Sequence, residues 1–261
     1  MTTTTAASGI RAPLSTRLAL VAGSVAAAAA FAWPFFVPAL PQDAQKAAPY
    51  LALALVPAII AALLLALDRQ VASAKTVALL GVLGAVGAAA RVLGDTVGGV
   101  EPVFVVLVLA GRALGARFGF LLGLVVVAVS AVVTGGIGPW LPFQLFACAW
   151  VGAGAGLLPR TERLSRVGEL VMLAAYGAIA SWLVGALLNL WFWPFAIGAG
   201  SSISYVPDAP LAHNLKAFAL YSLATSTLTW DTVRAITTVV GIAVVGRPLL
   251  AALRRAKLRR P

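Results

Sequence analysis

Charged residues are scarce in this chain of 261 residues. They make up 10% of the sequence, whereas hydrophobic residues make up 61%, and a soluble domain carries about 25% charged residues. So few charges cannot cover the surface of a water-soluble globule. Several apolar stretches approach or exceed the roughly 20 residues that a helix needs to cross a bilayer. The composition therefore predicts an all-α polytopic membrane protein, and the period-two alternation typical of an outer-membrane barrel is absent.

Acidic residues are scarcer still, with 8 Asp and Glu against 19 Lys and Arg and a net charge of +11. This excess does not indicate nucleic-acid binding, because the basic residues flank apolar segments and no soluble basic domain remains to bind nucleic acid. Their positions fit the positive-inside rule, and the basic tail at 254–261 is expected to meet anionic lipid. The clusters are Arg11 and Arg17; Arg69 and Lys75; Arg112 and Arg117; Arg160, Arg163 and Arg166; and Arg254 to Arg260.

Cysteine and histidine each occur once, which excludes an intrachain disulfide. We expect Cys148 to be a small packing residue in a helix rather than a reactive thiol. His213 has no cluster of metal-ligating neighbours, no plausible Ser-His-Asp set is present, and no glycine-rich phosphate loop carries its lysine. The sequence therefore predicts no catalytic residues, no metal and no cofactor, so the chain is not expected to be an enzyme.

The apolar segments and their flanking charges predict eight membrane crossings. Residues 1–16 are expected to be a disordered cytoplasmic tail, and the first helix is expected to be retained because no convincing signal-peptidase site follows it. Basic and aromatic loops alternate, which places both termini in the cytoplasm of a cell (plasma) membrane protein. The predicted spans are residues 17–37, 50–67, 76–93, 101–113, 117–134, 141–158, 167–192 and 231–253.

Residues 213–230, "HNLKAFALYSLATSTLTW", are also apolar but do not fit this count. A ninth crossing would place the sequence "RRAKLRR" outside the cell, against the positive-inside rule. The segment is short and carries Lys216 and several hydroxyls. We therefore expect it to re-enter the membrane or to lie along the outer interface, as a broken extension of the last helix.

Small residues recur at intervals of four and predict close helix packing. Gly111, Gly115, Gly119 and Gly123 cross the tight turn between the fourth and fifth spans, which must form a helical hairpin. Their spacing permits close backbone approach, and the alternative is that glycine is simply common in membrane helices. Other stripes face either a helix of the same chain or a partner protein, and the spacing alone leaves both open. They are Gly81, Ala85 and Ala89; Ala54, Ala58, Ala62 and Ala66; and Cys148, Gly152 and Gly156.

Three predicted outer loops combine aromatic, polar and glycine residues. Of the seven tryptophans, none lies at the basic face, whereas an interfacial aromatic belt occurs at both membrane faces. This asymmetry favours a ligand pocket, mostly apolar with a few polar anchors, although a belt remains the alternative. The candidate binding residues are Asp95 and Glu101 of "LGDTVGGVEP", Trp140 and Gln144 of "GGIGPWLPFQ", and Asn189, Trp191 and Trp193 of "NLWFWPF".

Ionisable residues inside the apolar segments are few. Arg91 lies at the outer end of the third span, and Asp231 and Arg234 lie three residues apart at the start of the last one. That spacing puts Asp231 and Arg234 on one helix face. The pair is expected either to anchor the helix end as a neutralised couple or to orient a polar ligand at the outer mouth.

These features together resemble the substrate-binding (S) components of energy-coupling factor (ECF) vitamin transporters, and most of all the cobalamin-type group. The resemblance covers residues 75–260. It is carried by the arrangement of the short hairpin, the Gly-Pro-Trp mouth and the long aromatic outer loop. The stretches concerned are "EPVFVVLVLAGRALGARFGF", "GGIGPWLPFQ", "LLNLWFWPF", "TSTLTWDTVRAI" and "GRPLLAALRR".

The resemblance implies a six-helix membrane core at residues 75–253 that holds a vitamin at its extracellular side. Such a component performs no chemistry. It associates with a transmembrane coupling protein and two ATP-binding cassette (ABC) ATPases, and it topples in the membrane to release its ligand. A small-residue stripe on the first core helix meets the coupling protein in this family, which here points to Gly81, Ala85 and Ala89. Two further N-terminal helices, within residues 17–70, depart from the family core, so the Ala54 to Ala66 face competes as the coupling surface.

Two other functions stay open from the residues alone. A stand-alone secondary transporter needs no ATPase, but the chain shows no repeated half and few deep carboxylates. A membrane enzyme or assembly factor would depend on Asp95, Glu101, His213 or Asp231. The solute itself cannot be read from the fold. Cobalamin is the first choice by resemblance, followed by riboflavin, thiamine and other small vitamins.

Overall fold

The computed structural model describes residues 14–35, 74–95, 98–159, 165–197 and 200–258, and these are helices joined by short turns, with no strand among them. Side chains are described for all of these except 14–20, 95, 257 and 258. The expected span at 50–67, the stripe from Ala54 to Ala66, residues 1–13 of the predicted tail and the extreme C-terminus, 259–261, lie outside the described residues.

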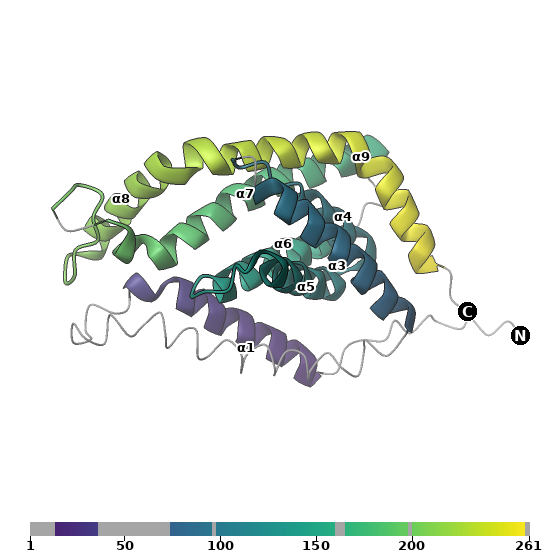
Figure 1. The fold of residues 1–261 in the computed structure, drawn as a ribbon, viewed down its shortest axis with the longest axis horizontal. Coiled ribbons are helices and arrows are strands. Elements are labelled where there is room, and N and C mark those ends of the chain that lie inside the picture. The colour runs from purple at the N-terminus through teal and green to yellow at the C-terminus, as the bar shows by residue number, and fades with distance from the viewer. Residues whose placement is uncertain (1–13, 36–73, 96–97, 160–164, 198–199, 259–261) are drawn as a thin grey trace, which may run out of the picture.

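The described helices follow the chain in the order drawn in Figure 1. Helix α3 and the elements after it form one bundle, and α1 packs along its side. The elements are α1 (Leu14–Phe31), a short 3-10 turn η1 (Trp33–Phe35), α3 (Ala74–Asp95), α4 (Val103–Leu114), α5 (Ala116–Thr134), α6 (Leu141–Leu157), α7 (Arg166–Ala196), α8 (Leu211–Ser222), the π-helix η2 (Leu223–Asp231) and α9 (Thr232–Leu258).

The predicted spans within the described ranges coincide with helices to within a few residues. Within the part of the chain that the structure describes, four helical stretches are long and apolar enough to cross a membrane: Ala74–Gly94, Ala116–Thr134, Arg166–Ala196 and Leu211–Ala256. This architecture is compatible with a helical membrane protein.

Helix α7 extends beyond its predicted span, which ends at residue 192: the helix continues to Ala196 and contains Pro194. Trp193 is consequently a helix residue rather than a loop residue. Figure 1 shows the end of α7 side by side with α8, and Phe218 of α8 packs against Trp193.

The expected break between residues 213–230 and the last helix is also absent. Helix α8, η2 and α9 form one continuous helical stretch from Leu211 to Ala256. The hydroxyls of this stretch donate back to the helix, Thr225 to the carbonyl of Tyr221 and Thr232 to the carbonyl of Thr227. A π-helix keeps the backbone hydrogen-bonded while it widens the turn, so Ser and Thr are accommodated without an interruption.

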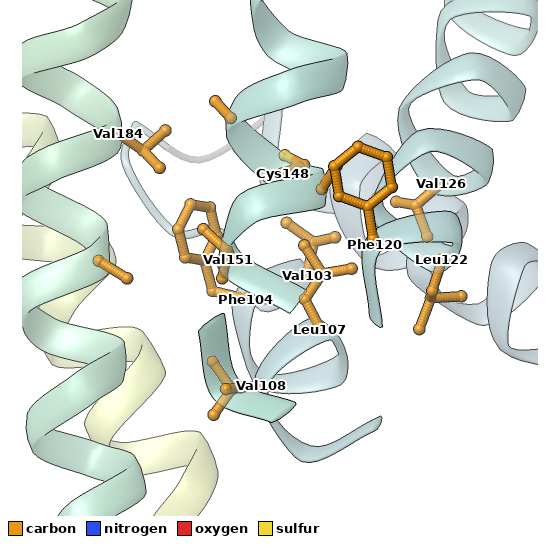
Figure 2. Packing of buried hydrophobic residues seen from close by; sticks show 14 of the residues in the cluster. Val103, Phe104, Leu107, Val108, Phe120, Leu122, Val126, Cys148, Val151 and Val184 are labelled. Carbon is orange, nitrogen blue, oxygen red and sulfur yellow. The ribbon is translucent and has the colours of Figure 1, made fainter. Parts of the chain in front are cut away.

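Helix α4 lies at the centre of the bundle. It has only 12 residues, about 18 Å of helix, which is too short to cross a bilayer core of about 30 Å. Nine of its residues are buried, as expected for a helix that is apolar on all sides. Figure 2 shows Phe104, Leu107 and Val108 of α4 among side chains of α5, α6 and α7.

Glycines allow α4, α5 and α6 to touch along their backbones. A single residue, Gly115, separates α4 from α5, and its φ of +106° is one that glycine adopts readily. A side chain at Gly111 would overlap the carbonyl of Gly152 in α6, and one at Gly152 would overlap the carbonyl of Gly119 in α5. The predicted hairpin and its glycine-mediated packing are confirmed, and Gly152 of the third stripe faces these helices rather than a partner.

Helix α1 is fastened to α6 and α7 by aromatic side chains. The ring of Phe31 meets the ring of Phe143 edge-on at 4.9 Å between centroids. The indole of Trp33 donates to the carbonyl of Trp191 at 2.9 Å, and the indole of Trp150 donates to Ser24 at 3.2 Å. Helix α1 is therefore packed onto the bundle.

The glycine contacts predict unequal effects of one methyl group at two positions. Gly152→Ala is expected to lower the free energy of unfolding by about 1–3 kcal/mol, because the methyl group forces two backbones apart. Gly81→Ala is the matched control, since no atom lies within 4 Å of a side chain there; it should leave stability unchanged or raise it. Thermal unfolding in detergent measures both, and equal midpoints would contradict the packing described.

Candidate functional site

A polar cavity of about 130 Å³ lies between the helices. Its walls combine two arginines, a glutamate and a glutamine with apolar side chains, in a bundle whose described core is mostly hydrocarbon. Polar side chains around an internal cavity of a membrane protein mark solute or ion sites. The lining residues are Arg91, Glu101, Phe104, Gln144, Ala147, Cys148, Val184, Leu188 and Arg234.

Arg91 reaches the cavity from α3 and connects it to two other helices. One guanidinium nitrogen donates to the hydroxyl of Ser130 in α5 at 2.9 Å, and another donates to Oε1 of Gln144 in α6 at 3.0 Å. Both acceptors are neutral. The arginine is thus positioned by hydrogen bonds but keeps its positive charge uncompensated by them.

Arg234 enters from α9 and is 7% exposed. It donates to Oε1 of Glu101 at 2.6 Å and to Oδ1 of Asp231 at 2.8 Å. It also donates to the carbonyl of Ser181 in α7 at 3.1 Å. Its guanidinium carbon stands 5.4 Å from the ring centre of Phe104, within the range of a cation–π contact. A buried guanidinium needs such partners, so this residue ties α4, α7 and α9 together.

Asp231 extends the polar network into the π-helix. Its second oxygen accepts from Ser226 at 2.9 Å, and Ser226 accepts from the amide of Asn189 in α7 at 2.7 Å. The same amide donates to Ser222 at 3.1 Å. A side chain at Gly185 of α7 would overlap the Asp231 carboxylate, so this glycine provides the space for the buried acid. A π-helix beside a cavity is a frequent feature of functional sites.

A second charged cluster lies at the opposite end of the bundle. Glu169 of α7, 6% exposed, accepts from Arg112 of α4 at 2.8 Å and from Arg254 of α9 at 2.6 Å. Arg112 also donates to the carbonyl of Leu158 at the end of α6. These contacts hold four helix ends together and form no part of the cavity wall.

The predicted binding residues occupy different positions relative to the cavity. Glu101 and Gln144 line it. Asn189 does not line it but reaches Asp231 through Ser226. Asp95 is the last residue of α3, and its side chain lies outside the described residues.

The three predicted tryptophans do not line the cavity. Trp140 is 44% exposed and packs over Gly138. Trp191 is stacked on Phe143, with 4.6 Å between ring centres. Trp193 is fully buried and donates to the carbonyl of Ile203 at 2.7 Å. A ligand could stack on Trp191 or Trp193 only by displacing the groups already packed against them.

The binding residues predicted from the sequence do not include Arg91 or Arg234, yet both line the cavity. The sequence does indicate both residues, because an arginine in an otherwise apolar span is energetically costly unless it forms an ion pair or binds a ligand. The partners could not be read locally: Arg91 bonds Gln144, 53 residues away, and Arg234 bonds Glu101, 133 residues away. Asp231 and Arg234 do form the pair that their spacing predicted.

No family model, curated protein or solved structure matches this chain. The resemblance to ECF S components thus stays a prediction. In the described part of the chain, no group of three or more His, Cys, Asp or Glu side chains could hold a metal ion.

The buried ion pair predicts unequal effects of one chemical change at two aspartates. Asp231→Asn is expected to lower the free energy of unfolding by about 3 kcal/mol, because removing one partner leaves Arg234 less well compensated in an apolar interior. Asp208→Asn is the control: Asp208 is exposed with φ of +61°, a conformation that Asn adopts readily. If thermal unfolding gives the same midpoint for both variants, the network does not support the fold as described.

Proposed function

We propose that this chain is the substrate-binding (S) component of an ECF-type ABC importer, and that it binds a vitamin or vitamin-like solute for ATP-driven uptake by partner subunits. The observation that carries the proposal is the polar cavity among apolar helices. Its walls offer hydrogen-bond donors and acceptors from α3, α6 and α9 and the loop before α4. A chain that only filled the bilayer would have no use for such groups, because each is costly to bury.

The site combines a few polar anchors with apolar surroundings, which is the composition of small-molecule sites. A volume of about 130 Å³ holds a small solute or one polar end of a larger one. Cobalamin, the first choice by resemblance, could place only a fragment there and would need the helices to open. The cavity is also smaller than the roughly 300–1,000 Å³ of typical ligand pockets, so a smaller vitamin would likewise place only part of the molecule there.

The outward face of α3 supports a docking role for the proposed coupling surface. Gly81, Ala85 and Ala89 are all exposed, and a side chain at Gly81 would meet nothing within 4 Å. The opposite face of α3 is occupied, because Gly84 and Gly87 pack against Val125 and Val126 of α5. A smooth exposed stripe permits close helix packing inside lipid, which is what a transmembrane coupling protein would require.

The sequence contains no phosphate-binding loop with its lysine, so this chain would depend on partner ATPases for energy. One observation favours a second candidate function, a stand-alone secondary transporter. Glu101 and Asp231 are carboxylates held against a buried arginine, and ionisable groups inside a membrane also mark proton and ion pathways. Uptake experiments separate the two functions.

The proposed function predicts ATP-driven uptake that depends on the α3 stripe. The chain is expressed with the coupling protein and cassette ATPases of the same cell, and vitamin uptake is measured in vesicles with and without internal ATP. Gly81→Leu and Ala85→Leu should abolish complex formation and uptake, because each fills the groove between helices. Val82→Leu is the control, since Val82 is already a large side chain, 63% exposed, next to the stripe.

Solute binding by the isolated chain is expected to survive in both stripe variants, measured by intrinsic tryptophan fluorescence against a vitamin panel. Uptake by vesicles that hold this chain alone, driven by an ion gradient, would favour the secondary transporter. Failure to bind any vitamin, together with failure to assemble with a coupling protein, would end the S-component assignment.

A further inference from the structure

The charges at the cavity are unevenly paired. Arg91 and Arg234 contribute two positive charges, and Glu101 is the one carboxylate among the described lining residues. Asp231 does not line the cavity, but it brings the sum of these four charges to zero. Both carboxylates are bonded to Arg234 and neither is bonded to Arg91, so the negative charge is concentrated at one of the two arginines.

Arg91 is the arginine that this uneven pairing leaves with neutral partners. Two of its five N–H groups donate to neutral oxygens, those of Ser130 and Gln144. No carboxylate among the described side chains is paired with it. A guanidinium in an apolar bundle is stabilised far better by an anion than by neutral dipoles, and its remaining N–H groups form a planar fork suited to a carboxylate.

Arg234, which also lines the cavity, has an N–H donor without a hydrogen-bond acceptor. Its Nε is fully buried and is the single buried side-chain nitrogen or oxygen without a hydrogen-bond partner among the described residues. A buried donor without an acceptor destabilises a structure. A ligand oxygen that entered beside Arg234 would supply the acceptor after a small shift of the guanidinium.

We propose that the cavity selects a carboxylate, bound between Arg91 and Arg234, as the polar end of the solute. The inference rests on the proposed function and narrows its substrate to anionic solutes. The apolar part of the wall, formed by Phe104, Val184 and Leu188, contacts the carbons that bear the carboxylate. With about 130 Å³ available, the bound fragment is a short aliphatic acid or the acidic end of a longer molecule.

The test compares propionate with propionamide, which has the same shape and no charge. The purified full-length chain in detergent is titrated with each compound at pH 7 and constant ionic strength, and the midpoint of thermal unfolding is recorded. Propionate should raise the midpoint with a saturable dose dependence, and propionamide should not. Arg91→Gln should weaken propionate binding by about tenfold or more, because it removes a charge-assisted contact.

Arg91→Lys keeps the charge and should retain part of the binding, which separates loss of charge from loss of fold. Arg255→Gln removes an exposed charge near the end of α9 and should bind propionate as the unmodified chain does. Equal stabilisation by propionate and propionamide, or equal propionate binding by Arg91→Gln and Arg255→Gln, would overturn the proposal.

This outcome is separable from that of the proposed function. A chain that assembles with a coupling protein and takes up a vitamin, yet shows no preference for propionate, remains an S component with a different ligand chemistry. A chain that binds propionate through Arg91 but assembles with no coupling protein keeps the carboxylate site and loses the S-component assignment.

Discussion

A guanidinium buried among apolar helices must be paired, and the pairing of Arg234 determines how the cavity end of this bundle is built. Its carboxylate partners, Glu101 and Asp231, come from the turn before α4 and from the end of the π-helix. Its third partner is a backbone carbonyl of α7. Because burial of an unpaired charge costs several kcal/mol, these elements cannot separate without exposing it. The cavity wall is thereby fixed by the same contacts that keep the bundle closed.

Close backbone packing complements this charge network. Glycines bring α4, α5 and α6 together without large side chains at the contact, and apolar side chains of these helices pack closely in the core (Figure 2). The Arg112, Glu169 and Arg254 cluster fastens the other end. Among the described side chains, the buried charged groups are thus gathered around the cavity and in this second cluster. Charged groups gathered inside an otherwise apolar bundle are compatible with a protein that binds a solute while surrounded by lipid.

Much of the fold could be predicted from the sequence, because a membrane span depends on a local run of apolar residues. The α4–α5 hairpin followed from short apolar segments and glycines at intervals of four. The π-helix could not be predicted in this way, because the Ser and Thr residues of 223–231 indicate a weak helix. In the structure, threonine hydroxyls of this stretch donate to backbone carbonyls of the preceding turns. The hydrogen-bond partners of Arg91 and Arg234 could not be predicted either, because they lie far away in the sequence. Tryptophan and arginine are often ligand-binding residues, so a sequence alone makes each of them a candidate. Whether another side chain of the same protein already packs against it, as Phe143 packs against Trp191, is known only from the folded structure.

Native mass spectrometry of the protein extracted from its own membrane tests the central claim, that the polar cavity is the solute site, most directly. The account predicts one small molecule that is released from the unmodified chain and is absent from Gln144→Leu, whose cavity loses the acceptor that orients Arg91. The same molecule retained in full by Gln144→Leu would contradict it, because the solute would then be bound elsewhere.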